Sequence, residues 1–264
     1  MSSDSASCME YRRSRRCAHS NAGNYPSRPH PPLAGAVMNK EIRCISSSDE
    51  EWPTQLYQLS NPPKHLYVLG QNLQEIASEV TETVAIVGAR NSTHYGEKIS
   101  RDFATYFAAL GWSVVSGGAF GIDYNAHQGA LLIDGVTIAV LAGGLDLPYP
   151  RSHDGLFREV ISRGALISEQ PPGVRAAKGH FLNRNRIIAG LSMGTIVVEA
   201  AFKSGAIRTA RDSAELFRPV LALPGPITSP QSCGTHNLIR DRIAELVTSP
   251  LEARELLMRD LASG

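Results

Sequence analysis

The chain of 264 residues has few cysteines and no long apolar run. The spacing of Cys8, Cys17, Cys44 and Cys233 fits neither a zinc site nor a disulfide framework, which favours a reducing cytoplasmic location. No window approaches the roughly 18 consecutive apolar residues that a membrane-spanning helix needs. The beginning of the chain also lacks the apolar stretch of a secretory signal. We therefore expect a cytoplasmic protein without a membrane partner.

Residues 1–40 lack the period of a helix or a strand and are rich in Ser, Arg and Pro. This composition predicts a disordered segment, followed by one globular core over residues 41–264. A basic arm that binds nucleic acid is the alternative interpretation of the segment. Met38 is an alternative start of the protein.

Neither sign of charge dominates the chain, whose formal net charge is +1. The distribution is uneven, however, because residues 175–211 contain seven Lys and Arg side chains and one acid, Glu199. A locally positive surface on a nearly neutral body is typical of an anion-binding site. A solvated helix face is the simpler alternative.

Short apolar runs alternate with amphipathic segments from Thr83 onward. Periodicity predicts the following strands: 83–89, 112–118, 136–144, 165–169, 194–200 and 218–225. The helices expected between and after them are 96–111, 122–135, 152–164 with Ser152 as N-cap, 183–192, 204–217 and 234–247. The strands are almost continuously apolar, so the fold expected is α/β, with a mostly parallel sheet covered by helices on both faces.

The stretch SGGAFGID, residues 116–123, joins a predicted strand to a predicted helix. Gly118 and Gly121 are expected to form the turn, and the N–H groups of residues 121–123 would face an anion at the helix N-terminus. The stretch is neither a GxGxxG fingerprint nor a Walker A loop. Glycines at such junctions also serve packing alone, so this alternative stays open.

Several strings occur in an order that resembles one family, the DNA-processing protein A family (DprA, also called Smf). They include VAIVGAR, SGGAFGID, GGLDLPYPR, GHFLNRNRIIAGLS, VVEAAFKSGAIRTA and GTHNLIRD, and the resemblance covers roughly residues 51–247. It implies an extended Rossmann-like core that binds single-stranded DNA, forms dimers and helps to load the RecA recombinase in natural transformation and recombination. It implies neither a catalytic activity nor a cofactor or metal for this core.

The resemblance also implies a basic pocket for DNA at the sheet edge. The matching positions are Arg90, Gly118, Phe120, Gly121, Lys178, Arg184, Asn185, Arg186, Lys203, Ser204, Gly205 and Thr209. The family usually has a basic or aromatic residue, often Arg, where this chain has Phe120, whose ring could stack on a base. Arg208 also departs from the usual pattern. No C-terminal winged-helix domain is expected within the sequence.

Some residues have more than one interpretation. Arg184 and Arg186 are two apart and cannot share a helix face, so one is expected to reach the pocket and the other to pair with a carboxylate. Asp123 and His127 could form an acid–base pair, but a helix-capping Asp and a packed His are favoured. Apolar residues near the C-terminus (Leu238, Ile239, Ile243 and Leu246) could form a dimer contact or belong to the core.

Two other functions share this kind of fold. One is a sensor that binds a small nucleotide without DNA. The other is a phosphoribohydrolase that acts on nucleoside monophosphates, whose PGGxGTxxE signature is broken here into LPGPITSPQSCGTH. Among the three functions, a non-catalytic single-stranded DNA binder is preferred.

Overall fold

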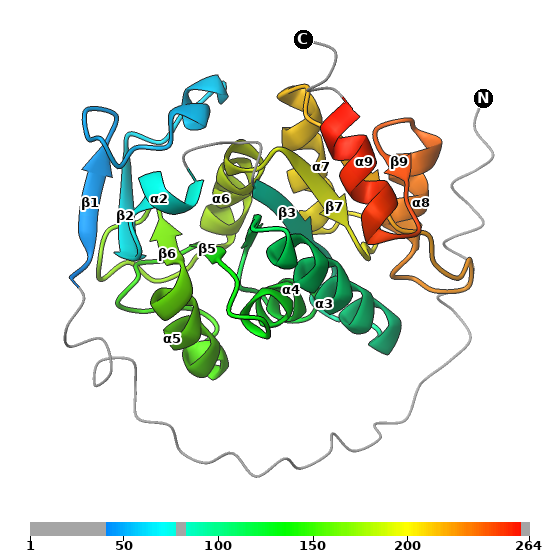
Figure 1. The fold of residues 1–264 in the computed structure, drawn as a ribbon, viewed down its shortest axis with the longest axis horizontal. Helices are drawn as coiled ribbons and strands as arrows, with labels where there is room; N and C mark the ends of the chain where they lie inside the picture. The colour runs from blue at the N-terminus through cyan, green and yellow to red at the C-terminus, as the bar shows by residue number, and fades with distance from the viewer. Residues whose placement is uncertain (1–40, 78–82, 260–264) are drawn as a thin grey trace. The chain divides into compact units, whose positions relative to one another are not determined.

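A computed structural model describes residues 41–77 and 83–259 (Figure 1). The predicted disordered segment, residues 1–40, lies outside the described residues. Among the described residues, no helix combines the length and the apolar character needed to cross a membrane.

The described residues form one sheet of nine strands in the order β1-β2-β6-β5-β4-β3-β7-β8-β9. The seven strands from β6 to β9 in this order are mutually parallel, whereas β1 and β2 extend one edge in antiparallel pairing. The strands are β1 Arg43–Ser46, β2 His65–Gly70, β3 Thr83–Val87, β4 Ser113–Ser116, β5 Thr137–Leu141, β6 Ala165–Ser168, β7 Gly194–Val197, β8 Val220–Ala222 and β9 Glu245–Leu246. The predicted α/β fold with a mostly parallel sheet is confirmed.

Helices cover both faces of this sheet (Figure 1). Their bounds are η2 Thr54–Gln58, α2 Leu73–Ala77, α3 His94–Ala109, α4 Ile122–Leu131, η4 Arg151–His153, α5 Asp154–Arg163, α6 Lys178–Leu191, α7 Gly205–Glu215, α8 Cys233–Arg240 and α9 Pro250–Arg259. The sheet residues of one face pack with η2, α6, α7 and α8. Those of the other face pack with α3, α4 and α9 beside the central strands and with α5 beside β5 and β6.

Successive residues of the central strand show why its apolar run is continuous. Val84 and Ile86 of β3 belong to the cluster that contains α3 and α4, whereas Ala85 and Val87 belong to the cluster that contains α6 and α7. Because side chains alternate between the two faces of a strand, a sheet covered on both faces needs apolar residues at every position.

Three local predictions were wrong. Ser152 lies in the short helix η4, and α5 has His153 at its N-cap without a side-chain cap. The helix predicted to begin at residue 183 begins at Lys178. The final predicted helix, 234–247, ends at Arg240, because Arg242 adopts a left-handed φ of 56° and the N–H of Ile243 turns back to the carbonyl of Leu238.

The strand order places a switch point between β3 and β7. Successive strands continue from β3 through β4 and β5 to β6 on one side, whereas the chain then continues from β7 through β8 to β9 on the other. Connections diverge at such a point and leave a crevice beyond the carboxyl ends of the strands, where ligands of open parallel sheets bind. The loops after β3 and β7 are therefore the first place to search for a site.

Candidate functional site

A cavity of about 610 Å³ lies at this switch point. Its walls come from the loop after β3, the glycine turn after β4, the first turns of α6 and the first turns of α7. The lining residues used below are Arg90, Ala119, Asp123, Lys178, Phe181, Arg184, Asn185, Ser204, Gly205 and Thr209. This volume is within the range of small-ligand pockets.

Two exposed cations line the cavity without a carboxylate partner. Arg90 and Lys178 form no ion pair within the described part of the chain. The guanidinium of Arg90 lies over the ring of Phe181, 4.7 Å from its centroid. Phe181 is half-buried and presents an aromatic surface beside the cation. The sequence interpretation missed Phe181, because nothing in the residues around it indicated a contact with Arg90.

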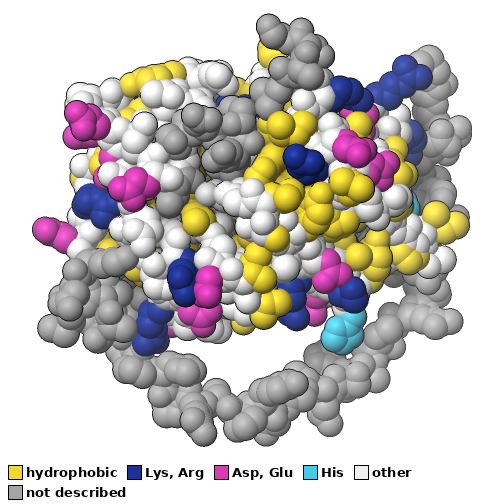
Figure 2. Space-filling model, in the orientation of Figure 1, with side chains coloured by type: hydrophobic (Ala, Val, Ile, Leu, Met, Phe, Trp, Pro, Cys, Tyr) yellow, Lys and Arg dark blue, Asp and Glu magenta, His cyan; other side chains and the backbone are white. Residues whose placement is uncertain are grey.

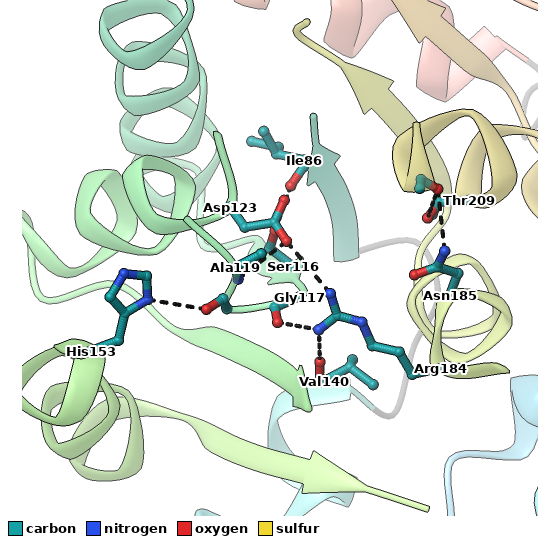
Figure 3. A network of polar contacts seen from close by, with 12 residues as sticks. Ile86, Ser116, Gly117, Ala119, Asp123, Val140, His153, Arg184, Asn185 and Thr209 are labelled. Carbon is teal, nitrogen blue, oxygen red and sulfur yellow. Dashed lines mark hydrogen bonds and ion pairs between the residues drawn. The ribbon is translucent and has the colours of Figure 1, made fainter. Parts of the chain in front are cut away.

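Arg184 also lines the cavity, but backbone carbonyls engage its guanidinium. The side chain donates to the carbonyls of Gly117 and Val140, at the ends of β4 and β5, and is 7% exposed (Figure 3). The carboxylate of Asp123 lies 3.9 Å away. Burial lowers the pKa of Arg184 to about 10, which still leaves it charged at neutral pH. This arginine holds the strand ends together and has little surface left for a ligand.

Glycines form the turn after β4, as predicted. The atoms around Gly118 and Gly121 indicate that these glycines allow close packing of the turn. Gly118 and Gly121 have φ values of 66° and 75°. A Cβ on Gly121 would lie 2.3 Å from the carbonyl oxygen of Ala89, and one on Gly118 would meet Phe157. His153 donates from Nδ1 to the carbonyl of Gly118 and fixes the turn from α5's side (Figure 3).

An internal carboxylate already lies at the start of α4. Asp123 is the second residue of the helix, whose N-cap is Gly121, so the predicted capping role of Asp123 was wrong. Its carboxylate accepts from the N–H of Ala119. Burial raises the pKa of Asp123, while the charge of Arg184 and the N–H of Ala119 lower it. The helix end expected to face an anion therefore has a carboxylate of the protein beside it.

The start of α3 has a similar internal anion. Glu199, which follows β7 and is buried, accepts from the backbone N–H of Thr93 at 2.9 Å and from its hydroxyl at 2.5 Å. Thr93 in turn caps the helix by accepting from the N–H of Gly96. Glu199 is thus a capping group for α3 rather than a partner for the basic segment.

The starts of α6 and α7, on the other face of the sheet, differ from these two. Neither helix has an acidic residue in its first turn or a side-chain cap. The N-cap of α7 is Ser204, whose hydroxyl is buried without a hydrogen-bond partner within the described residues. Asn185 and Thr209 both direct hydrogen bonds to the carbonyl of Gly205 (Figure 3). Residues of the first turns of both helices line the cavity, so each helix start adds partial positive charge near it.

The remaining predicted site residues lie outside the cavity lining. Arg186 forms a two-point ion pair with Glu169 and also donates to the carbonyl of Asn61. Lys203 lies on the loop before α7, next to residues that line the cavity. Phe120 is exposed and packs edge-on against His153, with 4.7 Å between the ring centroids. The structure therefore brings together Arg90, Lys178, Arg184, Asn185, Ser204, Gly205 and Thr209.

The basic segment 175–211 does not form one patch. Three of its arginines are committed to other groups: Arg184 to carbonyls, Arg186 to Glu169, and Arg208 to Asp212. On the face seen in Figure 2, Lys and Arg side chains are separated and interspersed with acidic ones. Among the residues that line the cavity, positive charge thus comes from Arg90, Lys178 and the buried Arg184, together with the helix starts.

His127 has a structural role. It is fully buried, and its Nδ1 lies 2.7 Å from the hydroxyl of Thr137, which donates to the carbonyl of Val114. Its Nδ1 therefore carries the proton, and burial lowers its pKa to about 3. The alternative of a packed histidine describes it, and no acid–base pair with Asp123 is formed.

The order of the strands and the cavity at the switch point place this chain in the class of Rossmann-like α/β proteins. The comparisons with known proteins narrow this class. The family model described as DNA recombination-mediator protein A matches residues 43–258. The chain belongs to this family, the DprA/Smf family.

Individual relatives agree with this assignment. The putative DNA processing protein DprA of Mycobacterium tuberculosis is 42% identical over 224 residues, which cover 80% of this chain and 57% of that protein. The solved structure of DprA from Streptococcus pneumoniae is 36% identical, with a TM-score of 0.73 and coverage of 82% of this chain and 74% of that one. The Helicobacter pylori protein, whose structure describes a single-stranded DNA binding mode, has 29% identity, a TM-score of 0.73 and coverage of 83% and 97%.

Proposed function

We propose that this chain binds single-stranded DNA without catalysis, with phosphates held in the cavity at the switch point. The observation that carries the proposal is the convergence of two unpaired cations, Arg90 and Lys178, with the acid-free starts of α6 and α7. Helix N-termini and cations are the groups that bind phosphate in proteins. Membership of the DprA/Smf family and the single-stranded DNA bound by the H. pylori relative support DNA as the source of those phosphates.

An unpaired base has a place beside these phosphates. Phe181 lies in the cavity wall with the guanidinium of Arg90 over its ring, and bases stack on planar guanidinium groups as they do on aromatic rings, without selecting a sequence. Phosphate contacts carry no base information either. We therefore propose a binder with little sequence preference, for which Phe120 is a second, exposed aromatic contact.

The experiment compares variants that differ only in where the charge is removed. Binding of a fluorescent poly-T strand is measured at several salt concentrations for the parent, Arg90→Ala, Lys178→Ala and the control Arg211→Ala. Arg211 is an exposed arginine of the same basic segment that does not line the cavity. Each lost phosphate contact should lower the salt slope by about 0.7, because a neutralised phosphate on a single strand releases about that many counterions.

The outcomes separate the possible functions. Weaker binding and a smaller slope for Arg90→Ala and Lys178→Ala, with Arg211→Ala like the parent, supports the proposal. Equal slopes for all four proteins would contradict it. Binding of mononucleotides in the absence of any binding to poly-T would favour the small-nucleotide sensor instead.

Two further roles follow from the family and belong to this proposal. We propose that the chain pairs with a second copy and helps to load RecA onto single strands in the cytoplasm during transformation and recombination. Part of the expected dimer surface is core, since Leu238, Ile239 and Ile243 pack inward, but Leu246 is exposed. The hydrophobic band visible in Figure 2 is a candidate surface. The aligned region is little more than half of the M. tuberculosis relative.

Sedimentation at tens of micromolar tests the pairing, for which a monomer is the contradicting result. RecA assembly on a single strand that carries this protein, compared with the bare strand, tests the loading. No acceleration of assembly would remove that part of the proposal.

A further inference from the structure

An exposed phenylalanine lies on the rim of the cavity. Phe202 is in the loop between β7 and α7, and the residues that bracket this part of the loop, Ala201 and Ser204, both line the cavity. The side chain of Phe202 is 66% exposed. Such exposure forgoes most of the stabilisation that burial of a large apolar side chain gives. The sequence interpretation did not single out this residue.

The next residue, Lys203, has an unusual backbone conformation. Its φ is 63°, in the left-handed region that non-glycine residues rarely adopt. The ammonium of Lys203 lies 5.5 Å from the centroid of the Phe202 ring. It has no carboxylate partner within the described part of the chain. A ring and a free cation are thus held together in solvent beside the cavity.

The wall formed by α6 also presents aromatic side chains. Phe181 packs edge-on against Tyr149, with 5.8 Å between the ring centroids, and Tyr149 is 48% exposed. Phe181 is on α6, whereas Phe202 is on the loop before α7. Aromatic surfaces therefore come from two separate elements that both border the cavity, and each has a cation beside it, Arg90 and Lys203.

We propose that Phe202 and Lys203 form a rim subsite for a nucleotide adjacent to the one in the cavity. The base of that nucleotide stacks on the exposed ring of Phe202, and its phosphate contacts Lys203. This inference rests on the proposed binding of single-stranded DNA and extends it. The ligand is a strand of at least two nucleotides with unpaired bases, since a base in a duplex has no free face for the ring.

The variant Phe202→Ala removes the ring, and Phe217→Ala is its control. Phe217 follows α7, whereas Phe202 precedes it. Phe217 is 96% exposed and itself has a left-handed φ of 56°, as Lys203 does beside Phe202. The length of α7 separates the two by roughly 16 Å at 1.5 Å per residue. Loss of a stacked base corresponds to about 1–3 kcal/mol, so Phe202→Ala should weaken poly-T binding about 5- to 150-fold.

Three ligands distinguish stacking from other effects of the substitution. Thymidine monophosphate fills the cavity alone, so its affinity should be the same for the parent and Phe202→Ala. A strand of the same length without bases should also bind both proteins equally. The salt slope with poly-T should not change, because no phosphate contact is removed. Phe202→Trp should restore poly-T affinity, and its exposed indole should be quenched by the strand, while Trp52 and Trp112 are buried.

The variant Lys203→Gly tests the role of the Lys203 charge. Glycine adopts the left-handed conformation readily, so the substitution removes the cation at a position that suits glycine. Its salt slope should fall by about 0.7. The inference is overturned if the parent binds poly-T and Phe202→Ala binds it equally well, or if the strand without bases loses as much affinity as poly-T. A parent that binds no strand would instead contradict the proposed function itself.

Discussion

Replacement of Arg184 by methionine tests whether this arginine positions the site or contacts phosphate. Methionine has a similar length but no charge or donors. The change leaves the carbonyls of Gly117 and Val140 without these donors and leaves the buried carboxylate of Asp123 without its nearby cation. Removal of one partner of a buried ion pair destabilises proteins by about 3–5 kcal/mol. We expect a loss of this size in the free energy of unfolding at pH 7, measured by urea denaturation.

The carboxylate of Asp123 supplies the matched control. Asp123→Asn combined with Arg184→Met removes both charges, so the double variant should regain more than half of the stability lost in Arg184→Met. Acid should also relieve the single variant. Burial raises the pKa of Asp123 in the folded state and the charge of Arg184 opposes this effect, so the pKa of Asp123 should be higher in Arg184→Met than in the parent. Above the unfolded pKa of about 3.9, the ionised form of Asp123 therefore penalises folding of the variant more than folding of the parent, and this extra penalty disappears as pH falls. The difference between parent and Arg184→Met should therefore shrink from pH 7 to pH 4.5.

Two results would refute this reasoning. One is an Arg184→Met protein that unfolds at the same urea concentration as the parent. The other is a double variant less stable than the single one. The double variant also separates the two roles of Arg184 in binding. A positioning residue leaves the salt slope for poly-T unchanged, whereas a direct phosphate contact lowers it by about 0.7.

Three further substitutions have outcomes fixed by single contacts. Gly121→Ala should lower the thermal midpoint by several degrees, because its Cβ would meet the carbonyl of Ala89. The control Gly155→Ala places its Cβ in open space and should raise the midpoint slightly, so equal shifts in the two variants would contradict the prediction. Glu199→Ala should destabilise by about 1–3 kcal/mol in urea denaturation, because the Thr93 N–H loses its acceptor; unchanged stability would argue against the cap. The pKa of His127 is lowered to about 3 against about 6.5 when unfolded, so its contribution to stability is present above pH 6.5 and lost as pH falls toward 3. His127→Gln should weaken this acid dependence, and an identical pH profile would exclude it.

The sequence predicted six of the seven parallel strands well, because the strands from β3 to β8 are buried on both faces and have glycine or proline beside them, whereas the two residues of β9 are exposed. It missed β1 and β2, because the first strand predicted from the sequence begins at residue 83. It also joined α8 to β9, because Leu238, Ile239, Ile243 and Leu246 have helical spacing. Only the left-handed backbone of Arg242, a conformation that arginine rarely adopts, ends the helix there.

The candidate site was predicted at the level of loops rather than of side chains. The strand ends and their glycines located the cavity correctly, since that follows from topology. Which arginine is free depends on the rotation of α6 against the sheet, and the sequence carries no signal for it. Arg184 faces the carbonyls of two strands and Arg186 faces Glu169, while Arg90, from a distant loop, reaches the ring of Phe181.

The carboxylates of Asp123 and Glu199 lie at the starts of α4 and α3, where they would compete with any anionic ligand for the same N–H groups. In Rossmann-like enzymes, the helix that follows the first parallel strand binds the pyrophosphate of the cofactor at its N-terminus. The corresponding helix of this chain is α3, which follows β3. In this chain the start of α3 is capped through Glu199, so a dinucleotide would have to displace a buried group covalently attached to the protein. Free dinucleotides would therefore bind weakly at the start of α3. The α3 side of this sheet therefore differs from that of a Rossmann-like nucleotide enzyme, because a group of the protein itself already occupies the start of the helix.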